Sequence, residues 1–352
     1  MPGAFNRIGY FCSMVPVEII MAAGFRPVWV KGRANMTAAA DAYLYPNICP
    51  YIKSLFTDAL EDGGTALDGL VFISQCDGMR RLHDVWKAYI PSKFIYMLQA
   101  PKNVDRLAVE YFATQLRDFA LQMEKVSGSE ITGPALKQAI KSANRTRGEM
   151  RDLYSLQTSS PLPVSGSELF DYGLQILFGE DNEAADRISS IRKKASKSVK
   201  HDKGKSKTRI MISGNVMDRP DLFQMIEDAG AEVPVADFYT ASRYFERTVD
   251  EHESDPFMAL AAAYLGAPRC SRTAAPDEIY ARISDNVKRY AIEGVLLTSL
   301  KFCDQQLYDI PGLLKRLNAD GTPVLFVEND YVFGDRDRVK TRVEAFVETL
   351  ES

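Results

Sequence analysis

The sequence predicts an α/β protein whose parallel sheets are covered by helices on both faces. Two continuous apolar segments, GLVFIS at residues 69–74 and GVLLTS at residues 294–299, lack the polar–apolar alternation of a half-exposed strand. Helical patterns separate them from neighbouring apolar segments, as parallel strands require. The arrangement occurs near both ends of the chain, with a long helical region between.

Near the N-terminus, short β-prone segments alternate with helical ones. A helical pattern at residues 16–23 separates the first two, and Gly24 follows it where a helix-ending glycine is expected. A second helical pattern covers residues 79–89. The predicted strands of this part are residues 7–12, 26–31, 69–74 and 93–98.

The middle of the chain has helical patterns without predicted strands between them. Apolar residues recur at helical spacing through residues 103–155, and a long helix is expected at 134–156, starting at Thr132 and Pro134. Residues 158–167 predict a loop, and further helices are expected as far as residue 191. We interpret this region as a helical insert.

A basic segment at residues 192–209 contains nine Lys or Arg residues and one Asp. A nucleic-acid-binding arm would explain it, but the segment has no interleaved aromatic residues, so a solvated helix end and linker is the favoured interpretation. The predicted domains are an N-terminal α/β lobe (1–102), a helical insert with basic linker (103–208) and a C-terminal α/β lobe (209–352).

The C-terminal lobe repeats the alternation of strands and helices. Its predicted strands are residues 209–213, 232–236, 294–299 and 323–328. Its predicted helices are residues 220–229, 276–291, 311–317 and 336–350.

Composition narrows the class of protein. The 352 residues are 46% hydrophobic and 26% charged, which is typical of globular proteins. The net charge of −4 gives no indication of a nucleic-acid-binding surface. No apolar run approaches the roughly 18–20 residues of a membrane span, and no signal-peptide pattern opens the chain. A cytoplasmic protein without membrane contact is therefore expected.

Several common chemistries have no sequence support. The chain has neither a P-loop, nor G-x-G-x-x-G after a strand, nor G-x-S-x-G. It has three histidines, too few for a zinc site built on several of them. Of these, His83 could shuttle a proton, although a packing role is more common.

Five cysteines in such a chain do not indicate a disulfide framework. Cys76 and Cys303 each follow a predicted buried strand, and Cys49 precedes Pro50, a good first residue for a helix. Thiolates are stabilised at helix N-termini, which gather at the carboxyl edge of a parallel sheet. Three converging thiolates could hold zinc, or a [4Fe–4S] cluster with one iron lacking a cysteine. Alternatively the cysteines are small buried hydrophobes, since no C-x-x-C pair is present.

The sequence around these cysteines resembles that of the 2-hydroxyacyl-CoA dehydratase family, which includes the benzoyl-CoA reductase subunits. The resemblance extends over nearly the whole chain in family order. It rests on GYFCSMVPVEIIMAAGFRPV (9–28), CPYIKS (49–54), DGLVFISQCDGMRRLHDVW (68–86), SGNVMDRPDLFQMIEDAGAEV (213–233), and KFCDQQ (301–306) through GTPVLFVENDY (321–331) to RVKTRVEAF (338–346).

The resemblance implies two flavodoxin-like, doubly wound parallel-sheet lobes with a helical insert. It also implies a [4Fe–4S] cluster held by Cys49, Cys76 and Cys303, with Cys12 near the site. Cys270 lies where some relatives carry extra cysteines. A double-cubane cluster is disfavoured because it needs more cysteine ligands than the five present.

The implied reaction removes water from a 2-hydroxyacyl-CoA. One electron reduces the thioester carbonyl, and the ketyl radical then expels the 2-hydroxyl group. Ser13 and Glu18 are candidate catalytic residues that contact polar groups of the substrate. Alternatively, Ser13 could be the N-cap of the following helix, and Glu18 could be a carboxylate in the first turn of that helix, where the helix dipole favours negative charge. Glu328 and Tyr331 could also face the implied active-site cleft between the two lobes, but a structural role is at least as consistent with the sequence.

The resemblance further implies three partners: an acyl-CoA substrate, a related second subunit in a heterodimer, and an ATP-dependent iron–sulfur activator protein. Two alternatives remain open. One is a subunit of benzoyl-CoA reductase or another ATP-driven low-potential reductase of the family. The other is a non-enzymatic α/β binding or scaffold protein with buried cysteines.

Overall fold

The computed structural model describes residues 7–32, 38–62, 67–180, 183–198, 207–268, 270–273, 276–331 and 334–352. The chain forms two compact units. The first unit consists of Met1–Arg145, Leu177–Glu180 and Arg247–Thr273, and the second of Thr146–Ile176, Asp181–Glu246 and Ala274–Ser352. The predicted division into an N-terminal lobe (1–102), a helical insert with basic linker (103–208) and a C-terminal lobe (209–352) stays a prediction. Part of the basic segment, residues 199–206, lies outside the described residues.

The first unit is built on a four-stranded parallel sheet. Its strand order is β2-β1-β3-β4, which is the order of flavodoxin-like folds. Every pairing is parallel, and β1 lies between β2 and β3, with Gly9 opposite both Val28 and Leu70. The strands are β1 (Arg7–Tyr10), β2 (Arg26–Trp29), β3 (Gly69–Ile73) and β4 (Ile95–Leu98).

Helices of the first unit bury one face each against this sheet or against one another. In α3 (Asp77–Tyr89), Met79, Leu82 and Trp86 recur at helical spacing and are buried. Gly24 follows the first helix with φ of 82°, which confirms its predicted position. The remaining elements are α1 (Val17–Ala22), η1 (Ala38–Ala42), α2 (Pro50–Asp62), α4 (Arg106–Ser127) and α10 (Pro256–Gly266).

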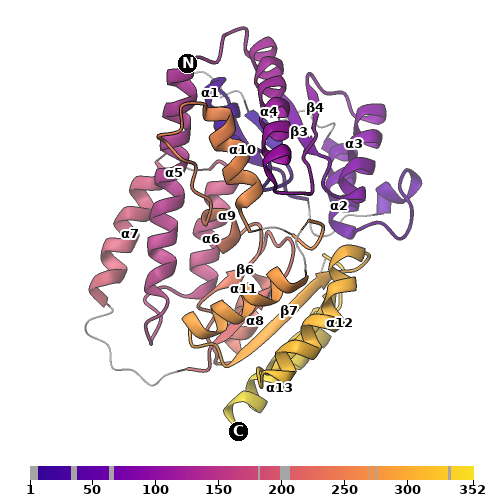
Figure 1. The fold of residues 1–352 in the computed structure, drawn as a ribbon. Helices are drawn as coiled ribbons and strands as arrows, with labels where there is room; N and C mark the ends of the chain where they lie inside the picture. Colours follow the sequence, from indigo (N-terminus) through magenta and orange to yellow (C-terminus); the bar gives the residue numbers. More distant parts are fainter. Residues whose placement is uncertain are drawn as a thin grey trace. The chain divides into compact units, whose positions relative to one another are not determined.

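Helix α10 packs beside α4, although the two are far apart in sequence (Figure 1). Asp255 begins α10 by accepting a 3.0 Å hydrogen bond from the Phe257 N–H. Its carboxylate also pairs with the Arg117 side chain of α4. The N-cap of α10 therefore also fixes this helix against α4.

Long helices occupy the middle of the chain, as predicted. They are α5 (Gly133–Leu156), α6 (Gly166–Leu177) and α7 (Ala184–Ser198). The Thr132 hydroxyl accepts a 3.3 Å hydrogen bond from the Ala135 N–H, which confirms the predicted start of α5.

The second unit repeats the parallel sheet. Its order is β6-β5-β7-β8, with β5 (Ile210–Ser213), β6 (Ala236–Asp237), β7 (Gly294–Leu300) and β8 (Val324–Asn329). Every residue of β7 is buried, because side chains pack on both of its faces. Val295 and Leu297 join the core beneath α11 and α12, whereas Gly294 lies against Phe346 and Leu350 of α13. The predicted α/β class with two doubly wound parallel sheets is confirmed.

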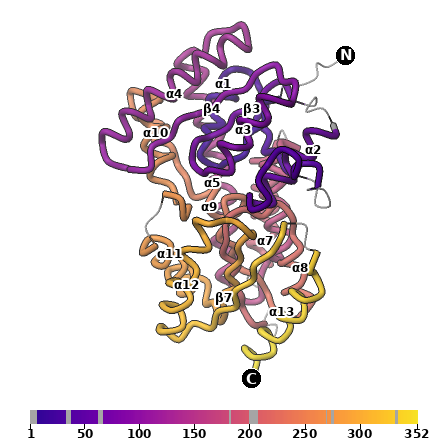
Figure 2. Tube along the Cα trace, turned by 90° about the vertical axis from the view of Figure 1, so that its right-hand side faces the viewer, coloured from indigo at the N-terminus to yellow at the C-terminus, as the bar shows by residue number. Residues whose placement is uncertain are grey.

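Four helices of this unit pack in two pairs. Helix α8 (Asp221–Asp228) lies beside α13 (Arg336–Glu351), and α11 (Pro276–Arg289) lies beside α12 (Asp304–Ala319) (Figure 2). The short α9 spans Ser242–Phe245. The predicted start of α12 at residue 311 is wrong, since Cys303 caps the helix and Pro311 lies inside it. The strand predicted at residues 232–236 is reduced to β6 and one bridge between Arg209 and Glu232.

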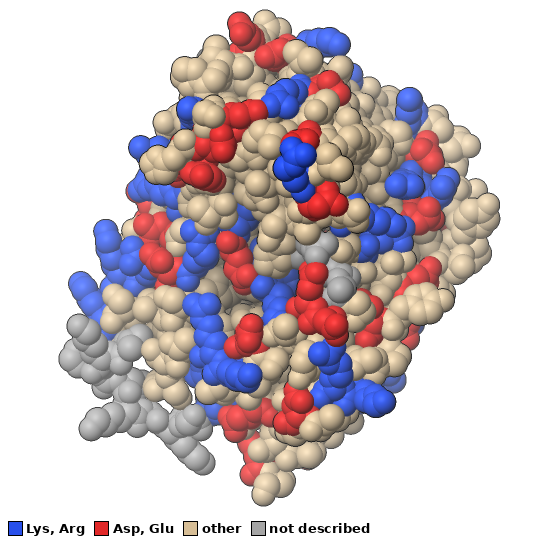
Figure 3. Space-filling model, viewed as in Figure 1, with Lys and Arg blue, Asp and Glu red and all other residues tan. Residues whose placement is uncertain are grey.

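No described helix combines the length and apolar character needed to cross a membrane. On the face shown in Figure 3, Lys and Arg residues are interspersed with Asp and Glu residues.

Candidate functional site

Cys76 lies at the carboxyl edge of the first sheet, where β3 turns into α3. It is the N-cap of α3, with extended backbone angles of −126° and 159°, and its sulfur accepts a 3.3 Å hydrogen bond from the Met79 N–H. A helix N-terminus favours a negatively charged sulfur. The local structure therefore suits Cys76 as a thiolate ligand.

Cys49 occupies an equivalent local position. It directly precedes Pro50, the first residue of α2, and its carbonyl group accepts a 3.3 Å hydrogen bond from the Lys53 N–H. Its side chain is partly exposed, as are those of the other four cysteines. Both first-unit cysteines of the predicted ligand set thus stand at helix N-termini.

Cys12 follows β1 at the same edge of the sheet. Desolvation raises the pKa of Cys12 to about 12, and the nearby Cys270 and Cys76 raise it further against the lowering effect of the Met14 N–H. Cys12 is therefore a protonated thiol at neutral pH. Cys12 therefore lies near Cys76 and Cys270 in the first unit.

Cys303 lies in the second unit, after β7. The preceding residue, Phe302, adopts a left-handed conformation with φ of 59°, and the Cys303 N–H donates to the Leu300 carbonyl at 3.1 Å. This tight turn makes Cys303 the N-cap of α12. Its sulfur accepts a 2.8 Å hydrogen bond from Nδ2 of Asn215, which follows β5.

Sequence reasoning did not single out Asn215. Its position directly after a buried strand places it at the carboxyl edge of the sheet, and this much is readable from the sequence. Its partner lies 88 residues away and can be known only once the strand order is known.

Ser13 and Glu18, the predicted catalytic residues, are both buried. The expectation that Ser13 caps the first helix is wrong, because Pro16 is the N-cap of α1 and that cap has no side-chain hydrogen bond. Glu18 does stand in the first turn of α1, and its side chain is fully buried. Contact of Ser13 or Glu18 with a substrate stays a prediction.

The surroundings of Glu18 include two residues that the sequence did not indicate. The Tyr264 hydroxyl donates a 2.7 Å hydrogen bond to the Glu18 carboxylate and accepts one of 3.3 Å from the Val17 N–H. The Arg247 guanidinium lies 3.8 Å from the centre of the Tyr264 ring. These contacts give Glu18 a structural role that joins α1 to α10.

Tyr331 also has a structural role in the second unit. Its hydroxyl donates a 2.6 Å hydrogen bond to Asp218, and its N–H donates to the Asn329 side chain at 3.1 Å. The Arg219 guanidinium stacks 4.7 Å from the ring centre. Tyr331 thus links the loops that follow β5 and β8, while Glu328 remains inside β8.

His83 packs edge-on against Phe72 at 5.4 Å, and its ring nitrogen lies 3.1 Å from the Asp84 carboxylate. These contacts agree with a packing role.

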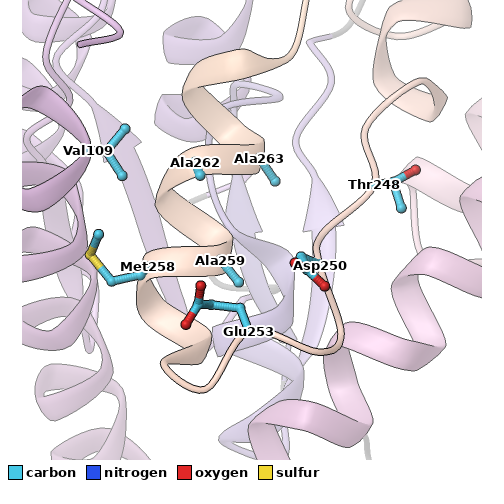
Figure 4. Close-up of a pocket in the computed structure, with 8 residues that line it drawn as sticks. All are labelled: Val109, Thr248, Asp250, Glu253, Met258, Ala259, Ala262 and Ala263. Atoms are coloured by element: carbon cyan, nitrogen blue, oxygen red, sulfur yellow. The ribbon is translucent and has the colours of Figure 1, made fainter. Parts of the chain in front are cut away.

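The first unit also contains a surface pocket of about 280 Å³ between α4 and α10 (Figure 4). Its lining includes Asp250 and Glu253 from the loop before α10, and Ala259 and Ala262 from α10. None of the predicted site residues is among its described lining residues.

The donor chemistry of the three cysteines fits an iron–sulfur cluster, because thiolates are its usual ligands and each cysteine stands at a helix N-terminus. Among the residues that the structure describes, no group of three or more His, Cys, Asp or Glu side chains is arranged to hold a metal ion. Cys49 and Cys76 belong to the first unit and Cys303 to the second. Their meeting at one cluster stays a prediction.

The chain thus belongs to the class of α/β proteins that contain two units, each built on a parallel sheet with cysteines near the carboxyl ends of its strands. The family model described as "2-hydroxyglutaryl-CoA dehydratase, D-component" matches residues 12–350, and the chain belongs to this family. The recognition made from the sequence motifs is thereby confirmed.

The chain is similar to subunits of a reductase and of dehydratases. The chain is 25% identical to a benzoyl-CoA reductase subunit of Thauera aromatica, over 98% of this chain and 90% of the relative. It is 24% identical to the (R)-phenyllactyl-CoA dehydratase beta subunit of Clostridium sporogenes, over 98% and 92%. It is 23% identical to the beta subunit of (R)-2-hydroxyglutaryl-CoA dehydratase of Acidaminococcus fermentans, over 98% and 92%.

Proposed function

We propose that this chain is the iron–sulfur subunit of a 2-hydroxyacyl-CoA dehydratase. The observation that carries the proposal is the family match over residues 12–350, which includes all three cysteines at helix N-termini. Two of the relatives are named as beta subunits of dehydratases that act on 2-hydroxyacyl-CoA thioesters. The proposed reaction is the removal of water from such a thioester.

Cys49, Cys76 and Cys303 are the proposed ligands of a [4Fe–4S] cluster. A cluster held there would supply one electron for a ketyl-radical dehydration and take it back at the end, while the thioester loses its 2-hydroxyl group and a β-proton, together as water. The Met79 N–H and the Asn215 amide each donate to a ligand sulfur and so stabilise its negative charge. Ser13 and Glu18 are the proposed catalytic residues and are proposed to contact polar groups of the substrate.

The proposal includes partners. Because two relatives are beta subunits, a related second subunit is proposed to complete a heterodimer. No P-loop occurs in this chain, so a separate ATP-dependent iron–sulfur activator is proposed to deliver the electron. The odd number of cysteines suits a reducing compartment, and we assign the protein to the cytoplasm as part of this proposal.

Iron and sulfide analysis after anaerobic purification tests the proposal. We expect iron and acid-labile sulfide in the wild-type chain and their loss in Cys76→Ser. Cys270→Ser is the matched control, since Cys270 is outside the proposed ligand set, and it should retain both. An iron-free, air-stable wild-type protein contradicts the proposal and favours the binding or scaffold alternative.

A second candidate function is a benzoyl-CoA reductase subunit or another ATP-driven reductase. The similarity to the benzoyl-CoA reductase subunit of Thauera aromatica favours it. The two reactions differ in their use of electrons, because a dehydratase recovers its electron after each turnover and a reductase consumes it. The complete enzyme should be assayed with activator, ATP and candidate acyl-CoA thioesters. Product in excess of electrons supplied supports the dehydratase, and stoichiometric electron consumption supports the reductase.

A further inference from the structure

The side chain of Asn215 donates a hydrogen bond of 2.8 Å to the sulfur of Cys303. Both residues belong to the second unit, Asn215 after β5 and Cys303 after β7. These strands are neighbours in the sheet, so their carboxyl ends bring the two residues together. A thiolate can only accept a hydrogen bond, and the amide therefore presents its Nδ2 group.

The backbone around Asn215 is held in place by both neighbouring strands. The Gly214 N–H donates to the Asp237 carbonyl at 3.2 Å, and the Tyr239 N–H donates to the Asn215 carbonyl at 3.1 Å. A Cβ atom at Gly214 would lie 2.5 Å from the Phe238 ring and 2.8 Å from the Thr298 side chain. This close packing fixes the end of β5 against β7.

The loop that carries Cys303 is fixed equally well. The Lys301 N–H donates to the Asn329 carbonyl at 2.8 Å, and the Cys303 carbonyl accepts from the Gln306 N–H at 3.0 Å. The Gln306 side chain bonds in turn to the Thr298 carbonyl at 2.8 Å. The hydrogen bond between Asn215 and Cys303 therefore joins two rigid loops and is preorganised in the protein alone.

We infer that Asn215 is a positioning residue that orients the Cys303 sulfur and tunes the reduction potential of the cluster it holds. The inference rests on the proposed function, because it takes Cys303 as an iron ligand. Hydrogen bonds to ligand sulfurs withdraw negative charge and favour the more negative, reduced state of a cluster. An amide is suited to this role, since it donates a proton in the hydrogen bond and does not titrate in the physiological range.

The test compares Asn215→Ala and Asn215→Asp with the wild-type chain, all purified anaerobically. Asp has nearly the shape of Asn but lacks the N–H donor. Asn318→Ala is the control, because Asn318 is exposed near the far end of the helix that Cys303 caps. Iron content and the midpoint potential, from a redox titration followed by electron paramagnetic resonance, are the readouts.

We expect all variants to retain iron. The midpoint potential should shift to more negative values in Asn215→Ala and further in Asn215→Asp, while Asn318→Ala matches the wild type. An unchanged potential in both Asn215 variants overturns the inference and leaves the proposed function intact. A wild-type chain without iron overturns the proposed function instead.

A second measurement needs no cluster. In the iron-free folded protein, the alkylation rate of each cysteine is followed by mass spectrometry near neutral pH. Loss of the donor should slow alkylation of Cys303 about fivefold or more in Asn215→Ala, because the thiolate is less stabilised. Cys76, in the other unit, serves as the internal standard. An unchanged Cys303 rate contradicts the inference even where the cluster has been lost.

Discussion

The hydroxyl group of Tyr264 lies 2.7 Å from the carboxylate of Glu18, although 246 residues separate them in the chain. Both side chains are fully buried. A buried carboxylate without a hydrogen-bond donor is costly, so this bond ties α1 to α10 within the first unit.

Replacing Tyr264 with Phe removes this donor and keeps the ring. We expect the free energy of unfolding to fall by about 1–3 kcal/mol, since a buried acceptor loses a partner. Guanidinium denaturation monitored by circular dichroism measures the change. Tyr89→Phe is the control, because Tyr89 is 56% exposed and should change stability by less than about 0.5 kcal/mol. Equal stability of the two variants would show that the bond contributes nothing.

Asp237 is the centre of a buried ion network in the second unit. It accepts hydrogen bonds from Arg243, from Arg282 at 2.5 Å and from Ser213 at 3.1 Å. Asp237→Asn leaves a buried guanidinium without its counter-charge, and we expect a loss of about 3–5 kcal/mol in unfolding free energy. Glu246→Gln, which weakens only the more exposed ion pair of Arg282, should cost no more than about 1 kcal/mol. A smaller effect of the Asp237 change than of the Glu246 change would refute this account.

The same network predicts how stability depends on pH. Burial alone would raise the pKa of Asp237, but the charges of Arg243 and Arg282 outweigh burial and hold this pKa below its usual range. A carboxylate with a lowered pKa stabilises the fold above the pKa of the unfolded state, about 4. Its contribution is lost as the pH falls from there toward the folded pKa.

The midpoint of thermal unfolding should therefore fall more steeply for the wild type than for Asp237→Asn between about pH 5 and pH 3. Parallel profiles of the two proteins over this range would contradict the assignment.

Two glycines of the second unit should respond in opposite directions to alanine. At Gly214 a Cβ atom would lie 2.5 Å from Phe238, and at Gly312, inside α12, it would meet nothing within 4 Å. We expect Gly214→Ala to destabilise the protein by about 1–3 kcal/mol through overpacking. Gly312→Ala should stabilise it by roughly 0.5–1 kcal/mol, because alanine is the better helix former. Urea midpoints of the two variants check both signs, and a stabilising Gly214→Ala would show that β5 has room to move.

The proposed ligand set predicts how substitutions of Cys49, Cys303 and Cys12 change the iron content. Cys49→Ser and Cys303→Ser should each lower the iron content of the anaerobically purified chain, since each removes one thiolate. Cys12→Ser should retain iron, because Cys12 is outside the proposed ligand set. Iron loss in Cys12→Ser with retention in Cys49→Ser would exchange these two residues in the ligand set.

The sequence predicted the architecture because buried parallel strands leave a direct signal. The apolar segments at 69–74 and 294–299 became β3 and β7, and the motifs around the cysteines identified the family. The weakest strand, β6, was misplaced because residues 232–235 are buried largely outside regular pairing.

What the sequence could not provide is the identity of contact partners. Periodicity shows that a residue is buried but not which residue it faces. The contact of Asn215 with Cys303 depends on β5 and β7 being neighbours, and that of Tyr264 with Glu18 depends on α10 returning to the first unit.

The return of residues 247–273 to the first unit has a consequence for synthesis. A ribosome releases the chain from its N-terminus, and domains generally fold as they emerge. The first unit lacks α10 and the buried Tyr264 until residue 273 has left the exit tunnel. Until then the first unit cannot complete its fold, and the apolar surface of α4 that α10 covers stays exposed. Most of the second unit's helices are made during this time. Nascent chains truncated before residue 247 are therefore expected to depend on chaperones, whereas chains long enough for residue 273 to have left the exit tunnel should protect α4 from proteolysis.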